Sequence, residues 1–166
     1  MEHAVRTPDV YLHLVLPEAS WYHAPLLAEY ADRYSRGVRL RLEMGRYILA
    51  EDYVRALRGR DLLIEEVDAA LRGRDALLLP SLGVPAIRLG AATVKVGGVE
   101  EPVRNIMLRL TQLFNITGHP AITIPCGATT DGLPIGAQLV GCRGGTDDLL
   151  SVATGAESRL QPGPGR

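Results

Sequence analysis

The last third of the sequence carries the pattern that most constrains the fold, which is two short apolar segments separated by a turn. Pro120–Pro125 (PAITIP) and Ile135–Val140 (IGAQLV) each predict a strand, and Thr130–Gly132 predicts a turn between them. Thr146 is then expected to cap a helix whose first turn holds two aspartates, because acidic residues favour the positive end of a helix dipole. This part of the chain therefore predicts a strand–turn–strand–helix unit.

Helical segments and short strands alternate along the rest of the chain. Val10–Leu16 predicts a strand or a buried segment ending at Pro17, and Asp75–Pro80 is typical of a strand buried on both faces. Residues 81–100 predict a glycine-rich loop with a little strand at Thr93–Val96. Helices are expected from Glu18 to about Gly37, from Leu40 to Ile48, from Ala50 to Arg72 and from Pro102 to Phe114. We expect a layered α/β fold, with a single domain over residues 1–160 and a flexible tail over 161–166.

Composition favours a soluble globular protein, since 46% of the residues are hydrophobic and 22% are charged. The net charge of −1 gives no reason to expect nucleic acid as a partner. No apolar run is long enough to span a membrane and no signal peptide is visible, so a cytoplasmic location is expected. The cysteines and histidines match no metal spacing, and neither a metal nor a cofactor is predicted. Cys126 and His119 fall on opposite faces of an ideal strand, which favours core or turn roles over a catalytic pair.

Motifs between Asp75 and Gly141 carry a more specific signal. The chain has DALLLPS at 75–81, FNITGHPAITIPCG at 114–127 and GLPIGAQLVG at 132–141. This order resembles the C-terminal pattern of amidase-signature enzymes, a family that includes general amidases and the A subunit of glutamyl-tRNA(Gln) amidotransferase. PEAS at 17–20, YH at 22–23 and AEDY at 50–53 also fall at comparable positions, so the resemblance covers nearly the whole chain. It implies the C-terminal portion of a mixed-sheet α/β/α fold.

The resemblance also implies hydrolysis of an amide C–N bond by a lysine and two serines, a combination that this sequence lacks. In that chemistry the lysine acts as base, because a serine hydroxyl is a poor nucleophile until an adjacent base takes its proton. The only lysine, Lys95, lies in the glycine-flanked loop. The serines are separate from one another and none has a Gly-Gly-Ser-Ser context; they are Ser20, Ser35, Ser81, Ser151 and Ser158. We therefore assign no catalytic residue and expect the chain alone to be inactive.

Four residues are candidates for a place near a substrate: Asn115, Gly118, Gln138 and Arg109. Asn115 and Gln138 are polar residues in apolar surroundings, where they either satisfy buried backbone groups or lie near a substrate channel. Arg109 either meets an anionic substrate or partner, or is a solvated or salt-bridged arginine. Glutamine-specific members of the family have an acidic residue in the helix before Asn115, and residues 103–114 contain none. This departure argues against a glutamine site.

Three functions remain open from the sequence. The chain is an incomplete amidase, a stand-alone binding or assembly module, or half of an enzyme that needs a complementary N-terminal amidase chain. Strands that would pair with the missing half leave sheet edges and apolar surface uncovered, which promotes association. We therefore expect either a homo-oligomer or a complex with such a complementary chain.

Overall fold

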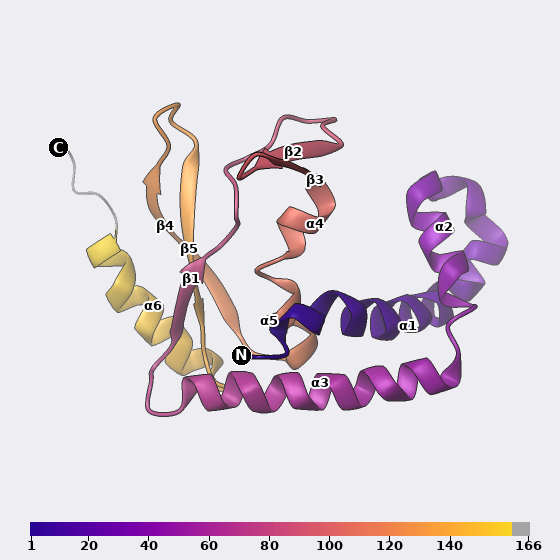
Figure 1. The fold of residues 1–166 in the computed structure, drawn as a ribbon, viewed down its shortest axis with the longest axis horizontal. Helices are drawn as coiled ribbons and strands as arrows, with labels where there is room; N and C mark the ends of the chain where they lie inside the picture. Colours follow the sequence, from indigo (N-terminus) through magenta and orange to yellow (C-terminus); the bar gives the residue numbers. More distant parts are fainter. Residues whose placement is uncertain (161–166) are drawn as a thin grey trace. The chain divides into compact units, whose positions relative to one another are not determined.

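The computed structural model describes residues 1–160, which form the mixed α/β fold that the sequence predicts (Figure 1). They group into two compact units, Met1–Glu65 and a second unit that begins at Glu66, and the boundary falls inside the long helix α3 (Ala50–Leu71). The single domain expected over residues 1–160 stays a prediction, and the expected tail at 161–166 lies outside the described residues. Within residues 1–160, no helix is both long and apolar enough to cross a lipid bilayer.

The first unit is built from helices. The short turn η1 (Ala4–Arg6) leads into α1 (Thr7–Tyr30), which is followed by η2 (Ala31–Arg33), α2 (Arg36–Gly45) and the first part of α3. Ser35 caps α2 by accepting a hydrogen bond from the Val38 backbone N–H at 3.4 Å. At the other end of α2, an added Cβ on Gly45 would lie 2.2 Å from the carbonyl oxygen of Leu16. α1 and α2 therefore approach so closely that only a glycine fits between them.

Of the two forms expected for Val10–Leu16, the strand is wrong, because these residues lie inside α1. Val10 and Leu14 are both buried, and a spacing of four residues puts them on one face of a helix. A short apolar run fits a helix as well as a strand, and here that packing decides between them. Pro17 and Pro25 also lie within α1, although each removes one backbone donor from the helix. Pro17 therefore does not end the segment.

The second unit contains two antiparallel sheets (Figure 1). The larger sheet has the strand order β1-β5-β4, with β1 at Leu77–Pro80, β4 at Ala121–Ala128 and β5 at Pro134–Val140. The smaller sheet is the hairpin of β2 (Thr93–Val96) and β3 (Val99–Pro102). The strands predicted at residues 75–80, 93–96, 120–125 and 135–140 are all confirmed, with small shifts at their ends.

Two short helices replace the single helix predicted from Pro102 to Phe114. Pro102 precedes α4 (Val103–Leu108), and the chain turns through Leu110 before α5 (Gln112–Thr117) begins. The carbonyl of Leu110 accepts a hydrogen bond from the Gln138 side chain at 3.0 Å, and Thr111 Oγ1 donates to the Leu108 carbonyl at 3.4 Å. These side chains satisfy carbonyls that a continuous helix would have bonded itself, which allows the break.

Helix α6 (Thr146–Leu160) covers one face of the larger sheet. The buried core between them consists of Ile124, Ala137, Leu139, Leu149 and Ala153. These residues come from α6, β4 and β5. β1 contributes none of them, since it is an edge strand, and its Leu78 side chain is 61% exposed. The prediction that this strand is buried on both faces is therefore wrong.

Candidate functional site

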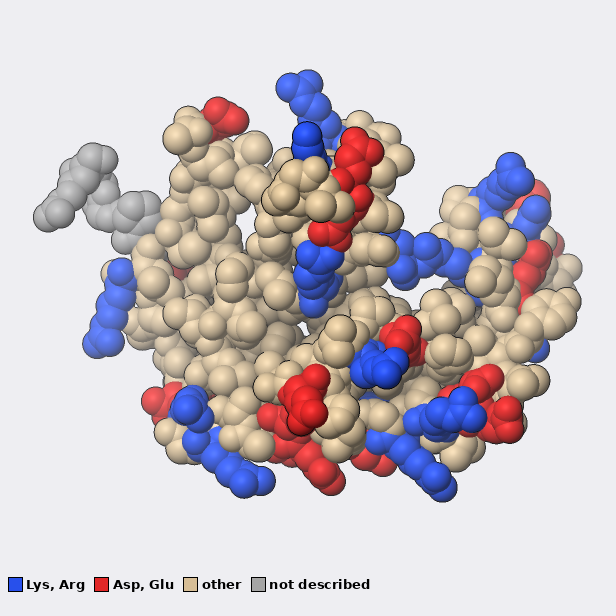
Figure 2. All heavy atoms as spheres, viewed as in Figure 1, with Lys and Arg blue, Asp and Glu red and all other residues tan. Residues whose placement is uncertain are grey.

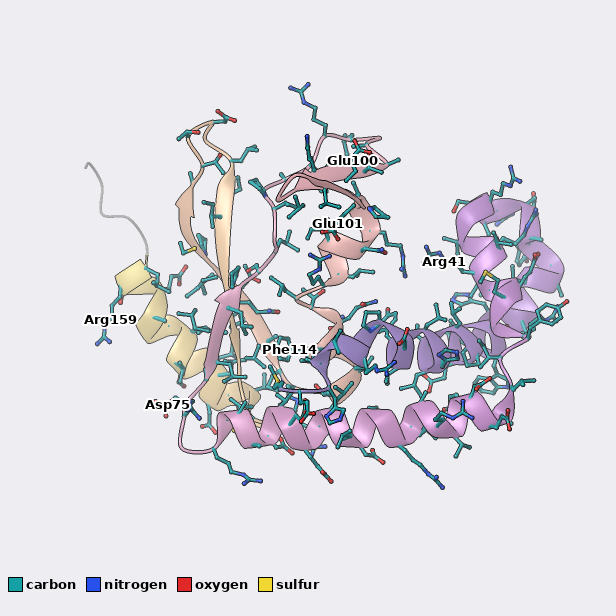
Figure 3. The ribbon with its side chains drawn as sticks, viewed as in Figure 1. Arg41, Asp75, Glu100, Glu101, Phe114 and Arg159 are labelled. Carbon is teal, nitrogen blue, oxygen red and sulfur yellow. The ribbon has the colours of Figure 1, made fainter. Side chains whose placement is uncertain are left out.

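Two of the predicted site residues meet at the turn between α4 and α5. Gln138 is buried in the central strand β5, and its Nε2 atom donates to the carbonyl of Leu110. Arg109, the residue before Leu110, is half exposed and forms an ion pair with Glu101 of β3, which lies beside α4 in Figure 3. Both side chains thus have structural partners. Gln138 satisfies a backbone carbonyl, and Arg109 joins the turn to the β2–β3 hairpin.

The other two predicted residues lie on α5 and at its end. Asn115 is exposed on the helix surface. Gly118 ends α5 with a φ of 72°, a left-handed conformation that favours glycine, and its N–H donates to the Phe114 carbonyl at 3.0 Å. Among the described residues, no hydrogen bond joins the four predicted residues to one another. Arg109, Asn115 and Gly118 share the segment from the end of α4 to the end of α5. Gln138 reaches this segment from β5 through its bond to Leu110.

A polar cluster that the sequence did not predict surrounds His119, directly after Gly118. The imidazole of His119 is buried, with Nδ1 at 2.9 Å from Thr117 Oγ1 and Nε2 at 3.0 Å from Asp68 Oδ1. Asp68 comes from the last turns of α3, and its other oxygen accepts from Arg143 at 3.2 Å. Cys126 takes no part, since its Sγ atom donates to the Ile135 carbonyl at 3.5 Å. His119 and Cys126 therefore have different hydrogen-bond partners in this structure.

The cluster changes the acidity of Asp68. The hydrogen bond from His119 is the main reason that the pKa of Asp68 lies below its ordinary value. Burial opposes this shift by raising the pKa, and the nearby Arg143 lowers it further. The carboxylate is therefore held ionised between two donors. No signal along the chain pointed to this pair, because Asp68 sits on a helix face that carries other charged residues as well.

A second polar contact joins the residue after β1 to a residue within β4. Ser81 Oγ lies 2.9 Å from Thr123 Oγ1, and the two side chains meet over Gly136 of β5. An added Cβ on Gly136 would lie 2.7 Å from Thr123 Cγ2 and 2.8 Å from Ser81 Oγ. Gly136 thus leaves the space that the Ser81 and Thr123 side chains occupy. The Thr123 hydroxyl is therefore the polar side-chain partner of Ser81 in this structure.

The first unit carries an aromatic hollow of about 780 Å³ between α1 and the start of α3. It is lined by Pro17, Glu18, Trp21, Tyr22, Ile48, Ala50 and Tyr53. The Tyr53 hydroxyl donates to Glu18 Oε1 at 2.9 Å, and this bond is the main reason that the pKa of Tyr53 is raised. Trp21 and Tyr22 are 81% and 69% exposed. The hollow therefore presents open aromatic surface beside one oriented carboxylate, a combination suited to a largely apolar small molecule.

Acid–base and metal chemistry have few candidates among the described residues. Lys95 is exposed on β2, whereas Ser81 directly follows β1 of the other sheet. No group of three or more His, Cys, Asp or Glu side chains within residues 1–160 is arranged to hold a metal ion. On the face shown in Figure 2, basic and acidic side chains are interspersed.

Comparison with known proteins supplies the wider context. Residues 22–150 match the sequence profile of the family described as Amidase. An amidase of Pseudomonas putida is 37% identical over 121 residues, which make up 72% of this chain and 26% of that protein. The A subunit of the glutamyl-tRNA(Gln) amidotransferase of Methanococcoides burtonii is 29% identical over 67% of this chain and 23% of its own length.

The fold agrees with the sequence comparison. A crystal structure described as that of an amidase superposes with a TM-score of 0.86 at 34% identity, over 93% of this chain and 35% of the other. This chain thus spans about a quarter of the length of the curated relatives named above and about a third of that solved chain. The profile match and the superposition both confirm the resemblance seen in the motifs, and the chain belongs to the amidase family, whose characteristic sequence is the amidase signature.

Proposed function

We propose that this chain is the C-terminal part of an amidase-family hydrolase and that it does not hydrolyse amides by itself. The complete activity would be hydrolysis of an amide C–N bond by Ser/Ser/Lys chemistry. One observation carries the proposal: the chain has the family's fold, yet the described serines and Lys95 form no nucleophile–base pair. The cytoplasmic location expected from the sequence stays a prediction.

The hydrogen bonds of the serines support this proposal. Ser35 caps α2, and Ser151 and Ser158 donate to carbonyls of their own helix, Asp147 at 3.0 Å and Gly155 at 3.1 Å. Such bonds to the local backbone are a structural use of serine. A separate chain that carries the lysine and serine stretch of an amidase would supply the missing chemistry. The Methanococcoides burtonii relative is named as one subunit of an enzyme, which agrees with a role inside an assembly.

The test compares this chain alone with the chain co-expressed with the part of the Pseudomonas putida amidase that precedes the matched region. We expect no hydrolysis of simple amides by the chain alone and detectable hydrolysis by a copurifying pair. Replacing Ser81 by Ala should leave that activity within a few-fold. Hydrolysis by the purified chain alone that disappears in the Ser81→Ala variant would show that the catalytic residues lie in this sequence after all.

The aromatic hollow favours a second candidate function, that of a binding module without catalysis. Its open rings and the Glu18 carboxylate suit an aryl or alkyl ammonium compound, because aromatic faces attract cations. Trp21 is the only tryptophan of the chain, so its fluorescence reports on this hollow. We expect benzyltrimethylammonium to quench that fluorescence in a saturable way. A Glu18→Gln variant should bind it at least about tenfold more weakly, and unsaturable quenching that is equal in both proteins would exclude the site.

A further inference from the structure

The two edges of the three-stranded sheet differ in how they are protected against pairing. β4 contains Pro125, which has no N–H to donate, and its register with β5 shifts between Pro125 and Gly127. A proline and a bulge are both features that block the addition of another strand. β1, at the opposite edge, has only the terminal Pro80, and no charged residue occurs between Asp75 and Arg88. The unprotected edge is therefore β1.

The ladder between β1 and β5 shows which backbone groups of β1 face outward. The Ser81 N–H donates to the Gly136 carbonyl at 2.9 Å, and Pro80 lies opposite Ala137. Bonded and non-bonded pairs alternate in an antiparallel ladder, so Leu79 also bonds with β5 while Leu78 does not. The N–H and C=O of Leu78 consequently point away from the sheet. Among the backbone hydrogen bonds that residues 1–160 make outside their helices and strands, none uses either group.

We infer that β1 pairs in antiparallel fashion with β1 of a second copy of this chain, about a two-fold axis that places the two Leu78 residues opposite each other. In this register, each Leu78 N–H donates to the Leu78 carbonyl of the other copy. The Ala76 N–H faces the Pro80 carbonyl of the other copy, and the ladder ends at Pro80 because proline lacks a donor. The edge is thus complementary to itself, as a two-fold interface requires.

Side chains and charges fit the same register. Leu78 lies opposite Leu139 of β5, on the face that α6 covers only over β4 and β5, and its side chain is 61% exposed. The pairing would bring the two Leu78 side chains together as a cross-strand apolar pair. Asp75, labelled in Figure 3, would face Ser81 of the second copy rather than a like charge. Because β4 is blocked, assembly stops at a dimer. The inference does not depend on the proposed hydrolytic function.

The test uses the full chain and two proline variants. Leu78→Pro removes the outward N–H without removing a bond to β5, and Ala121→Pro makes the matched change on β4, where the residue opposite Val140 also faces outward. Light scattering across a micromolar dilution series should show a dimer for the wild type and for Ala121→Pro. Leu78→Pro should weaken the dimer at least about tenfold. In the wild type, exchange of the Leu78 amide hydrogen should slow as concentration rises.

Each alternative result has a clear meaning. A wild-type monomer at all micromolar concentrations overturns the inference, and so does a dimer that Leu78→Pro leaves intact. If Leu78→Pro fails to fold by circular dichroism, the wild-type exchange measurement decides, and an unprotected Leu78 amide in the dimer overturns the proposal. A monomer that protects Leu78 only when co-expressed with the Pseudomonas putida segment would reject the second copy as the occupant. That result would leave the proposed function standing.

Discussion

His119 and Asp68 form a polar contact in which the imidazole is fully enclosed. The His119 side chain has no exposed surface, and both of its ring nitrogens have partners. An ionised carboxylate only accepts hydrogen bonds, so the proton must lie on Nε2 of His119. Asp68 is 41% exposed, which means that solvent screens its interactions with His119 and Arg143. The contact therefore orients the imidazole more than it stabilises the fold.

The lowered pKa of Asp68 predicts how stability depends on pH. A carboxyl group whose folded pKa lies below its unfolded value stabilises the fold above that unfolded value, about 3.9. That contribution is lost as the pH falls through the folded pKa. Asp68→Asn should cost about 1 kcal/mol near neutral pH, given the exposure of the group. The difference between wild type and variant should shrink below about pH 4, as measured by urea unfolding.

Asp131 provides the control, because it is exposed in the turn between β4 and β5 and no hydrogen bond or ion pair of its side chain is found in residues 1–160. Asp131→Asn should change stability by less than about 0.5 kcal/mol at any pH. A gap between wild type and Asp68→Asn that widened under acid conditions would contradict the assigned direction of the pKa shift.

Individual site residues differ in how well the sequence predicts them. The close approach at Gly136 follows from a glycine placed inside a strand pattern, which is a local signal. The partnership of Asp68 with His119 depends on how α3 packs beside the turn after α5, and no spacing along the chain encodes that packing. Gln138 was recognised as a polar residue among apolar neighbours. Its partner, the Leu110 carbonyl, could not be predicted, because it is available only where the helix breaks between α4 and α5.

At the scale of elements, the contact between α1 and α2 gives a sharp prediction. An added Cβ on Gly45 would lie 2.2 Å from the Leu16 oxygen and 2.8 Å from Ser20 Cβ. Because the first obstacle is backbone, the two helices would have to separate. Gly45→Ala should destabilise the first unit by about 1–3 kcal/mol. For a unit of this size, the midpoint of thermal unfolding should fall by roughly 4–8 °C per kcal/mol. Trp21 fluorescence during heating measures this midpoint.

Gly37 lies in the same helix and supplies the matched control. No atom lies within 4 Å of an added Cβ there, so Gly37→Ala should stabilise α2 by up to about 1 kcal/mol through helix propensity alone. Equal effects of the two substitutions would mean that α1 and α2 do not make the contact described above.

Helices and strands were predicted correctly where the sequence pattern was long, and the predictions failed where the pattern was short. α3 was predicted almost to the residue, because its apolar positions recur over 22 residues. The seven residues Val10–Leu16 fit either a helix or a strand, and the packing of Val10 and Leu14 decided for α1. The helix expected from Pro102 to Phe114 was divided by side chains from outside it, chiefly Gln138. In both places the structure depends on contacts between segments far apart along the chain, and a local sequence pattern does not encode such contacts.

At the scale of the whole molecule, each of the two compact units has buried apolar residues of its own. Leu14 and Leu42 lie in the first unit, and Ile124, Leu139 and Val140 lie in the second. A unit with its own core can unfold without the other, because opening it exposes mainly its own apolar surface. Trp21, the only tryptophan, lies in the first unit, whereas the amide hydrogens of β5 report on the second.

The Gly45→Ala variant can therefore test whether the chain unfolds in one step or in two. If the units unfold separately, the substitution should lower the Trp21 fluorescence midpoint while leaving hydrogen exchange at Val140, which is fully buried, within about threefold of the wild-type rate. If α3 couples the two units, the free energy of unfolding lost in the first unit is also lost in the second. The exchange rate at Val140 should then rise about tenfold for each 1.4 kcal/mol of that loss. We expect the first result. Parallel changes in both probes would show that the long helix couples the two units into one cooperative structure.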